Sequence, residues 1–379
     1  MNQEQMNAAM EAMIDWLSHP AELGKPPVKI ECAGEFDLYE LHYYIFKYKK
    51  NKLGRWLLGV SGGYKEDSLE NCGHMFSEME EYDPADAENK AIALVERVRS
   101  YIKEEAERVE ERKENPGNFI GYVLLEEAKW NKAEFLQNLK ATWDIEDEPE
   151  DEDEPEDENE EETETEEDIY DSDDTFVISY HGMMLAVSLM PGPIPDGEAE
   201  EAARNNFMWH EGAEQVKRHK AFLLVAVMGK GNSPIEGGKL LVKAVTVACK
   251  QEGVLGIYNG DGNVVYEPDY YLKCSQMMEE DLVPICNLIW FGLYRGRQGG
   301  LCGYTEGMSA FGYDEIEVLD SQADAESIHE FLMDIASYVI TEEAVLRDGE
   351  TIGFSETQRL PITKSKGVAV NGDSLKIGF

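Results

Sequence analysis

A serine motif near the N-terminal end is the first place where this 379-residue chain could carry out catalysis. Gly59-Val60-Ser61-Gly62-Gly63 fits the pattern G-x-S-x-G, in which a nucleophilic serine lies on a sharp turn between a strand and a helix. That chemistry needs a helix directly behind the serine. The residues after Ser61 are polar and show no apolar periodicity, so we interpret the motif as a glycine turn at the end of a strand.

Two histidines lie near other groups that could support catalysis. Cys72 and His74 place a thiol close to an imidazole, but such a pair is usually assembled from distant segments, so packing is the favoured role. His219 directly precedes an apolar segment and could act as a base. A surface or capping role for His219 is the simpler interpretation.

Carboxylates are abundant, and three of them lie in or beside extended segments. Glu315 and Glu317 alternate on one face of such a segment, and Glu350 precedes a short strand. Two of these groups could approach a metal ion, but no histidine pair accompanies them at ligand spacing. We therefore predict no metal and no cofactor.

A glycine-rich stretch at residues 296–307 lies beside Arg295 and Arg297. Its backbone N–H groups could bind an anion. It lacks the pattern G-x-x-x-x-G-K-[ST] of phosphate-binding loops, so we predict a flexible loop.

The charge of the chain is concentrated in one acidic run. Residues 144–174 contain 22 Asp and Glu and no Lys or Arg, so of the net charge of −44 the other 348 residues carry −44 + 22 = −22. A segment with this much like charge buries too little apolar surface to offset its chain entropy, and we predict that it is disordered. The acidity argues against nucleic acid and anionic membranes as ligands, because phosphates need local Lys and Arg.

The chain shows no signal for export or for crossing a membrane. The first 20 residues lack a basic region and a continuous apolar stretch, and Met6, Met10, Met13 and Leu17 recur at helical spacing instead. The six cysteines form no Cys-x-x-Cys pair, which indicates buried free thiols in a reducing compartment. We therefore predict a cytoplasmic protein with an N-terminal amphipathic helix and linker at residues 1–27.

Apolar periodicity predicts two folded units of the α+β class. In the first, at residues 28–116, a small sheet is followed by a helix from Ala87 to about Arg112. In the second, at residues 117–379, a strand, a helix ending at Trp143, the acidic run, two strands, a helical stretch and a strand follow one another. This is the order of a ferredoxin-like unit. The fold prediction is thus a small sheet-plus-helix unit and a larger, largely antiparallel, ferredoxin-like α+β domain with a disordered acidic insertion at 144–174.

The order of landmarks from Phe119 to Phe379 resembles a known bacterial family. The landmarks are LLEEAKW, LMPGPIPDGEAEEAARNNFMW, HKAFLLVAV, WFGLYR, YTEGMSAFGYDEIEVLD, DGETIGFS and LKIGF. They are similar to those of the family named domain of unknown function 4261, preceded by its N-terminal companion region. The resemblance supplies no catalytic residues. It does suggest candidate binding residues whose chemistry exceeds structural need: Glu198, Trp209, His219, Glu315, Glu317, Glu350 and Thr351.

Two functions remain open at this point. The first is a non-enzymatic protein-binding module of the immunity or adaptor type, whose acidic surface binds a basic protein. The second is a hydrolase that uses Glu and His residues of the C-terminal domain. The sequence does not decide whether the chain is an enzyme, and it does not indicate an oligomeric state.

Overall fold

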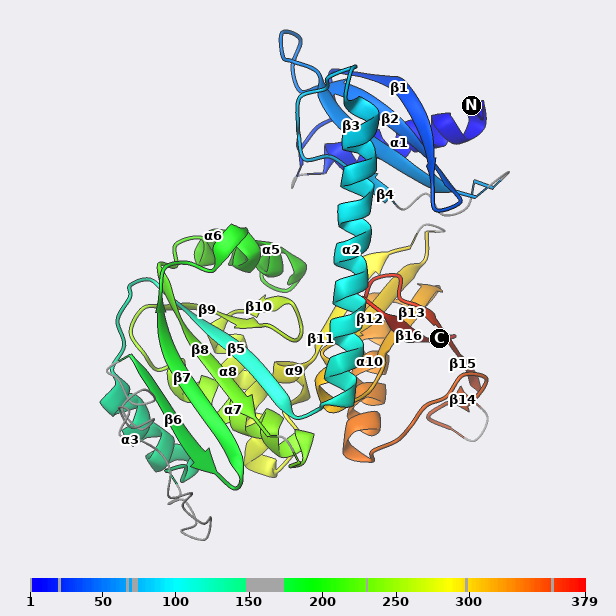
Figure 1. Ribbon diagram of the computed structural model, residues 1–379. Helices are drawn as coiled ribbons and strands as arrows, with labels where there is room; N and C mark the ends of the chain where they lie inside the picture. The colour runs from blue at the N-terminus through cyan, green and yellow to red at the C-terminus, as the bar shows by residue number, and fades with distance from the viewer. Residues whose placement is uncertain are drawn as a thin grey trace, which may run out of the picture. The chain divides into compact units, whose positions relative to one another are not determined.

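The computed structural model describes residues 2–19, 22–65, 68–69, 74–147, 174–229, 231–296, 299–355 and 358–379. It divides into two compact units, Met1–Glu105 and Ala106–Phe379 (Figure 1). The division falls within helix α2 (Ala87–Glu114), whereas the sequence places it at Pro116, just beyond the end of this helix. Helices combine with largely antiparallel sheets, so the predicted α+β class is confirmed.

The smaller unit is an antiparallel sheet with a helix on each face. Strands β1 (Lys29–Leu38), β2 (Leu41–Lys49), β3 (Leu57–Tyr64) and β4 (His74–Phe76) pair in the order β1-β2-β3-β4. Alternate side chains of β2 point to opposite faces. Tyr44 and Phe46 pack under α1 (Gln3–Ser18), and Tyr43 and Ile45 pack under the first turns of α2.

The serine motif lies inside β3, so the predicted turn at the end of a strand is wrong. Ser61 is fully buried, and the strand continues through Tyr64, with no helix among the described residues between Tyr64 and β4. The pairing of β2 with β3 shifts register where Tyr43 faces Gly62, which is a β-bulge. The two glycines permit this bulge and do not end the strand.

The larger unit contains a first six-stranded sheet in the order β10-β9-β5-β8-β7-β6, with every neighbouring pair antiparallel. Its strands are β5 (Asn118–Leu125), β6 (Thr175–Tyr180), β7 (Met183–Pro191), β8 (Ala221–Met228), β9 (Val254–Asn259) and β10 (Val264–Tyr266). Helices α3 (Lys132–Trp143), α7 (Pro234–Ala248) and α8 (Pro268–Ser275) lie on one face. The turn η1 (Pro195–Gly197) and helices α5 (Glu198–Asn205) and α6 (Gly212–Val216) cover the β5, β9 and β10 part of the other face.

The strand order corrects the predicted ferredoxin-like topology. That topology would place β5 beside β7 as a parallel pair, but here β8 lies between them and is antiparallel to both. Antiparallel neighbours need no crossover connection, so β7 returns directly into β8 after the short helices α5 and α6. The element order alone does not distinguish these two arrangements.

The acidic run enters this sheet at its edge. Helix α3 ends at Trp143 and β6 begins at Thr175, which are the limits that the sequence predicts. The Oδ1 atom of Asp147 accepts a hydrogen bond from Ser179 N on the edge strand β6 at 2.9 Å. Residues 148–173, and with them the predicted disorder of the insertion, lie outside the described residues.

A second six-stranded sheet has the order β11-β12-β13-β16-β15-β14, and only its pair β13–β16 is parallel. Its strands are β11 (Trp290–Arg295), β12 (Leu301–Glu306), β13 (Glu315–Ser321), β14 (Thr351–Ile352), β15 (Leu360–Lys366) and β16 (Asp373–Ile377). Helix α10 (Ala325–Thr341) packs on it, with Asp324 as its N-cap. Further short helices in the described part of this unit are η2 (Gln276–Glu280), α9 (Ile285–Leu288) and η3 (Met308–Phe311).

One continuous apolar core joins the two six-stranded sheets. The predicted flexible loop at residues 296–307 is wrong in its second half, because Leu301–Glu306 forms β12. Gly303 lies on this strand where Ile328 and Leu332 of α10 approach its backbone, so here a glycine serves close packing. Among the described residues, no helix combines the length and the apolar composition that crossing a membrane requires.

We expect Gly62→Ala to destabilise the smaller unit. A Cβ atom at this position would lie 2.6 Å from His42 O and from Tyr43 Cα, in a backbone conformation with φ +153°. The expected loss in the free energy of unfolding is about 1 to 3 kcal/mol, measured by urea denaturation. Gly34→Ala is the matched control, since its Cβ would meet only Ile45 Cδ1 at 3.6 Å. Equal stability of the two variants would contradict the close approach at Gly62.

Candidate functional site

Glu315 lies at the start of β13 and is buried. Its Oε2 atom accepts a hydrogen bond from Thr305 Oγ1 at 2.7 Å, and its Oε1 atom accepts from Gly307 N at 3.0 Å and Ser309 N at 3.3 Å. Burial raises the pKa of Glu315 to about 7, although these hydrogen bonds favour the ionised form. The carboxylate thereby holds the turn between β12 and β13.

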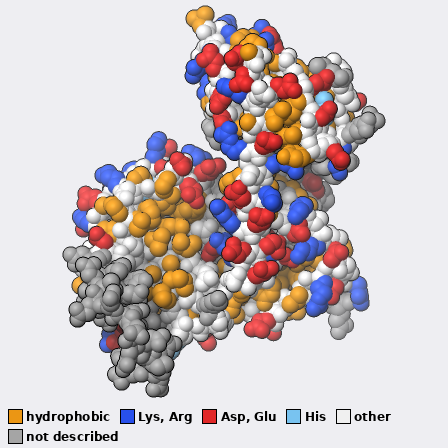
Figure 2. Space-filling view, in the orientation of Figure 1, with side chains coloured by type: hydrophobic (Ala, Val, Ile, Leu, Met, Phe, Trp, Pro, Cys, Tyr) orange, Lys and Arg blue, Asp and Glu red, His pale blue; other side chains and the backbone are white. Residues whose placement is uncertain are grey.

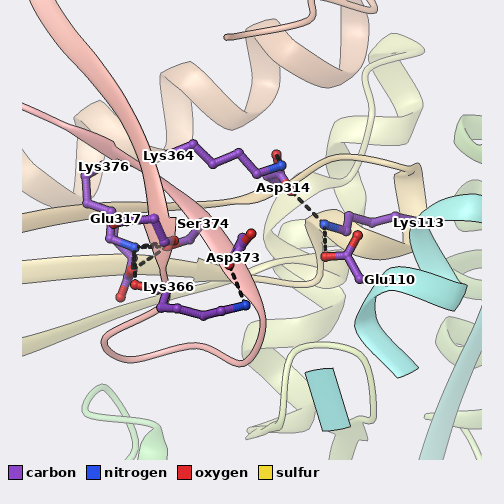
Figure 3. Close-up of polar contacts among 10 residues, drawn as sticks. Glu110, Lys113, Asp314, Glu317, Lys364, Lys366, Asp373, Ser374 and Lys376 are labelled. Carbon is purple, nitrogen blue, oxygen red and sulfur yellow. Dashed lines mark hydrogen bonds and ion pairs between the residues drawn. The ribbon is translucent and has the colours of Figure 1, made fainter. Parts of the chain in front are cut away.

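Glu317 is two residues further along β13 and is completely buried. Its carboxylate accepts hydrogen bonds from Val368 N at 3.1 Å, from Ala369 N at 2.7 Å and from the Ser374 hydroxyl. Lys376 Nζ lies 3.0 Å from Oε2 and completes an ion pair (Figure 3). Since these partners belong to β16 and to the loop before it, Glu317 fastens the C-terminal hairpin to β13.

A charged cluster with an adjoining cavity lies beside β13. Asp314 accepts hydrogen bonds from Lys113 Nζ and Lys364 Nζ, both at 2.6 Å, and Lys113 also donates to Glu110 at 2.6 Å (Figure 3). Burial opposes ionisation of Asp314, but the two lysines keep its pKa below the ordinary value. The cavity has a volume of about 300 Å³, and its lining combines this cluster with apolar side chains of β13, α10 and β16.

Three candidate residues lie around α5 and α6: Glu198, Trp209 and His219. The contacts described below do not involve Glu315 or Glu317 of the second sheet. His219 is buried, its Nε2 atom accepts from Ile194 N at 2.9 Å, and its Nδ1 atom donates to Val216 O. Both ring nitrogens are therefore engaged in hydrogen bonds that hold the backbone around His219. Glu198 is exposed and accepts from Tyr258 Oη at 2.7 Å. The half-buried Trp209 ring packs against Gly212.

Glu350 and Thr351 lie in a third place, at the hairpin of β14 and β15. Both are exposed. Glu350 accepts a hydrogen bond from Arg347 N at 3.1 Å, which closes the turn before β14. Within the described ranges, no hydrogen bond or ion pair joins any two of the seven candidate residues. Some of them only share a strand or a neighbouring helix. They form three separate local arrangements and no single constellation.

The remaining sequence motifs supply no reactive group either. Cys72 and Arg297 lie outside the described residues, and Arg295 is the last residue of β11. In the part of the chain that the structure describes, no three His, Cys, Asp or Glu side chains are grouped so that they could hold a metal ion.

Glu306, at the end of β12, is a titratable residue that the sequence reasoning missed. Burial raises its pKa to about 8, and the neighbouring charge of Glu315 adds to the effect. Lys113, Asp314 and Lys364 were missed as well. They come from α2, from the residue before β13 and from β15, so no local spacing in the sequence could have brought them together.

A second candidate site is an apolar sheet face that no described element covers. On β5 to β8, residues with even and odd numbers alternate between the two faces. One set is buried under α3 and α7. The other is half-buried or exposed except for Leu124, which packs with α5 and α6, and Met184, Met190 and Met228 have 43%, 39% and 46% of their surface exposed. We name this surface the open face; its apolar residues are Ile120, Val177, Met184, Ala186, Met190, Leu224, Ala226 and Met228.

Cross-strand pairing makes the open face continuous. Met184 is paired with Met228, and Ala186 is paired with Val177 on one side and with Ala226 on the other. Ala226 is in turn paired with Ile120. Figure 2 shows the corresponding hydrophobic side chains gathered over these strands. A contiguous apolar surface of this kind is typical of protein interaction sites.

The fold and these sites define an α+β protein with a sheet face that the described residues leave open and a charged cluster in its C-terminal segment. Residues 304–378 match the model of a family described as Domain of unknown function (DUF4261). The resemblance to this family is therefore confirmed for that segment, which contains β13, α10 and the C-terminal hairpin. No curated protein and no solved structure matches the chain.

We expect Glu317→Ala to destabilise the larger unit strongly. The substitution leaves the Lys376 ammonium, whose side chain is only 12% exposed, without its counter-charge, and it removes the acceptor of the Val368 and Ala369 N–H groups. Removal of one partner of a buried pair costs about 3 to 5 kcal/mol in the free energy of unfolding, which urea denaturation measures. The exposed Glu350→Gln is the control, and a similar small effect of both would refute the structural role of Glu317.

We expect Glu306→Gln to change the pH dependence of stability. The folded-state pKa of about 8 lies above the ordinary value of 4.5, so the folded protein keeps a proton that the unfolded chain releases. The stability that depends on the protonated Glu306 is fully present below pH 4.5. It is lost as the pH rises to 8, and the free energy of unfolding falls by at most about 1.4 kcal/mol per pH unit. Glu306→Gln should therefore gain stability relative to the wild type between pH 5 and pH 8. Parallel stability curves would exclude a raised pKa.

Proposed function

We propose that this protein is a non-enzymatic binding module whose open face takes an amphipathic helix of a basic partner protein. The single observation that carries the proposal is the open face itself. Apolar sheet faces are ordinarily covered by a second layer, and α3 and α7 provide that layer on the opposite face. A helix with an apolar stripe would provide the missing layer on the open face.

Charge complementarity supports a basic partner. Net charge is −44, and the acidic run of residues 144–174 begins and ends next to β6, the edge strand of the open face. Asp147 is bonded to Ser179 N, and the carbonyl of Asp174 accepts from Leu189 N at 2.7 Å. Lys and Arg on the flanks of a docked helix would therefore meet many carboxylates, which increases the association rate at low salt.

The contacts of the candidate residues favour binding over hydrolysis. Backbone N–H groups donate hydrogen bonds to Glu315, Glu317 and His219, and a neighbouring lysine pairs with Glu317. A hydrolase would need an acid, a base or a nucleophile that converges on one substrate position. We place this binding protein in the cytoplasm, as its cysteine usage favours.

The proposal can be tested by photo-cross-linking from the open face. A photoreactive amino acid in place of Met184 should capture a protein of positive net charge in cell extract. The purified partner should then bind the full chain more weakly as salt is raised. Met228→Glu should weaken this binding by at least about tenfold, because it puts a charge into the apolar contact.

Leu282→Glu is the matched control, since Leu282 is 49% exposed and Met228 is 46% exposed. It should leave binding unchanged. Three outcomes would overturn the proposal: cross-links only to a second copy of this chain, cross-links only within the chain, or a partner whose binding Met228→Glu does not affect.

A further inference from the structure

The cavity beside β13 shows which side chain a partner could insert there. We propose that this cavity binds the side chain of a Lys or Arg residue. The proposal rests on the proposed function in one respect, since it takes the cation from the same basic partner. The site itself is separate from the open face and is made by α2, β13, α10, β15 and β16.

The interior of the cavity is apolar. Its lining includes Ile316, Val339 and Leu375, which are 1%, 3% and 5% exposed, together with Val345 and Leu346 from the segment after α10. Lys and Arg bury their aliphatic stems against such surfaces while the charged head stays near polar groups. A volume of about 300 Å³ accommodates one such side chain together with some water.

The charges around the cavity favour a cation as the head group. Lys113 and Lys364 are already neutralised, because Asp314 accepts from both and Glu110 accepts from Lys113 (Figure 3). Glu114 also lines the cavity, and its carboxylate has no hydrogen-bond or ion-pair partner among the described residues. The acidic groups therefore exceed the basic ones by one, and the excess carboxylate is exposed.

The backbone reinforces this preference. Glu110, Lys113 and Glu114 belong to the last turn and a half of α2, where unpaired carbonyl groups give the helix a partial negative charge. Gly312 of the cavity lining has φ +88°, and its Cα lies near this helix end, since a Cβ atom there would be in van der Waals contact with Lys113 O at 3.5 Å. A carboxylate ligand would instead meet Glu110, Glu114 and the helix end, and it would have to displace Asp314 from its lysines.

Short peptides test the cavity in the full chain without the partner. Acetyl-Gly-Arg-Gly-amide and acetyl-Gly-Lys-Gly-amide should shift the methyl NMR signals of Val339, Val345 and Leu346 in a concentration-dependent manner. The same peptide with norleucine, which has the apolar stem without the charge, should bind more weakly. The peptide with glutamate should produce no shift. Raised salt should weaken the binding of the cationic peptides.

Glu114→Gln should weaken binding of the Arg peptide by about two- to fivefold, as expected for a partly exposed ion pair. Glu111→Gln is the matched control, because Glu111 is exposed on the same helix turn and does not line the cavity. Equal binding of norleucine, stronger binding of glutamate, or no shift with any peptide would overturn the proposal. These results concern the cavity alone, so they are distinguishable from a failure of cross-linking at the open face.

Discussion

The constraint on which the larger unit depends is that two six-stranded sheets must bury their apolar faces with few helices. One core, continuous from Phe119 to Ile377, meets this requirement for the inner faces of both sheets. Helices α3, α7 and α10 contribute to it, and α5 and α6 cover a further part of the first sheet. The β6, β7 and β8 strands retain an apolar outer surface, and this remainder is the basis of the binding function that we propose.

Much of the fold could be predicted from local pattern. The limits of α3 and β6 around the acidic run follow from the abrupt change in composition, and α10 follows from its Asp324 cap and apolar stripe. Strand order could not be predicted, because the same element order permits β8 to lie at either position beside β5. Residues 301–306 were misassigned since their glycines indicate a loop, whereas the approach of α10 favours a glycine inside β12.

The candidate residues show why polar chemistry is hard to assign from sequence. Glu315 and Glu317 were predicted as candidate binding residues, and both are buried. Their partners are backbone N–H groups of turns and a lysine 59 positions away by number, which no spacing rule predicts. The open face was missed for a different reason. Strands β7 and β8 are apolar at nearly every position, so the sequence does not reveal that no described element covers one of their faces.

The central claim is that a partner covers the open face in the cell, and methionine oxidation measures this most directly. Met184, Met190 and Met228 lie on the open face, and Met208, with 42% exposure, lies outside it as an internal reference. The four should oxidise at comparable rates in the purified chain treated with peroxide. In intact cells, the three open-face methionines should be protected relative to Met208. Equal rates for all four in both settings would contradict the account.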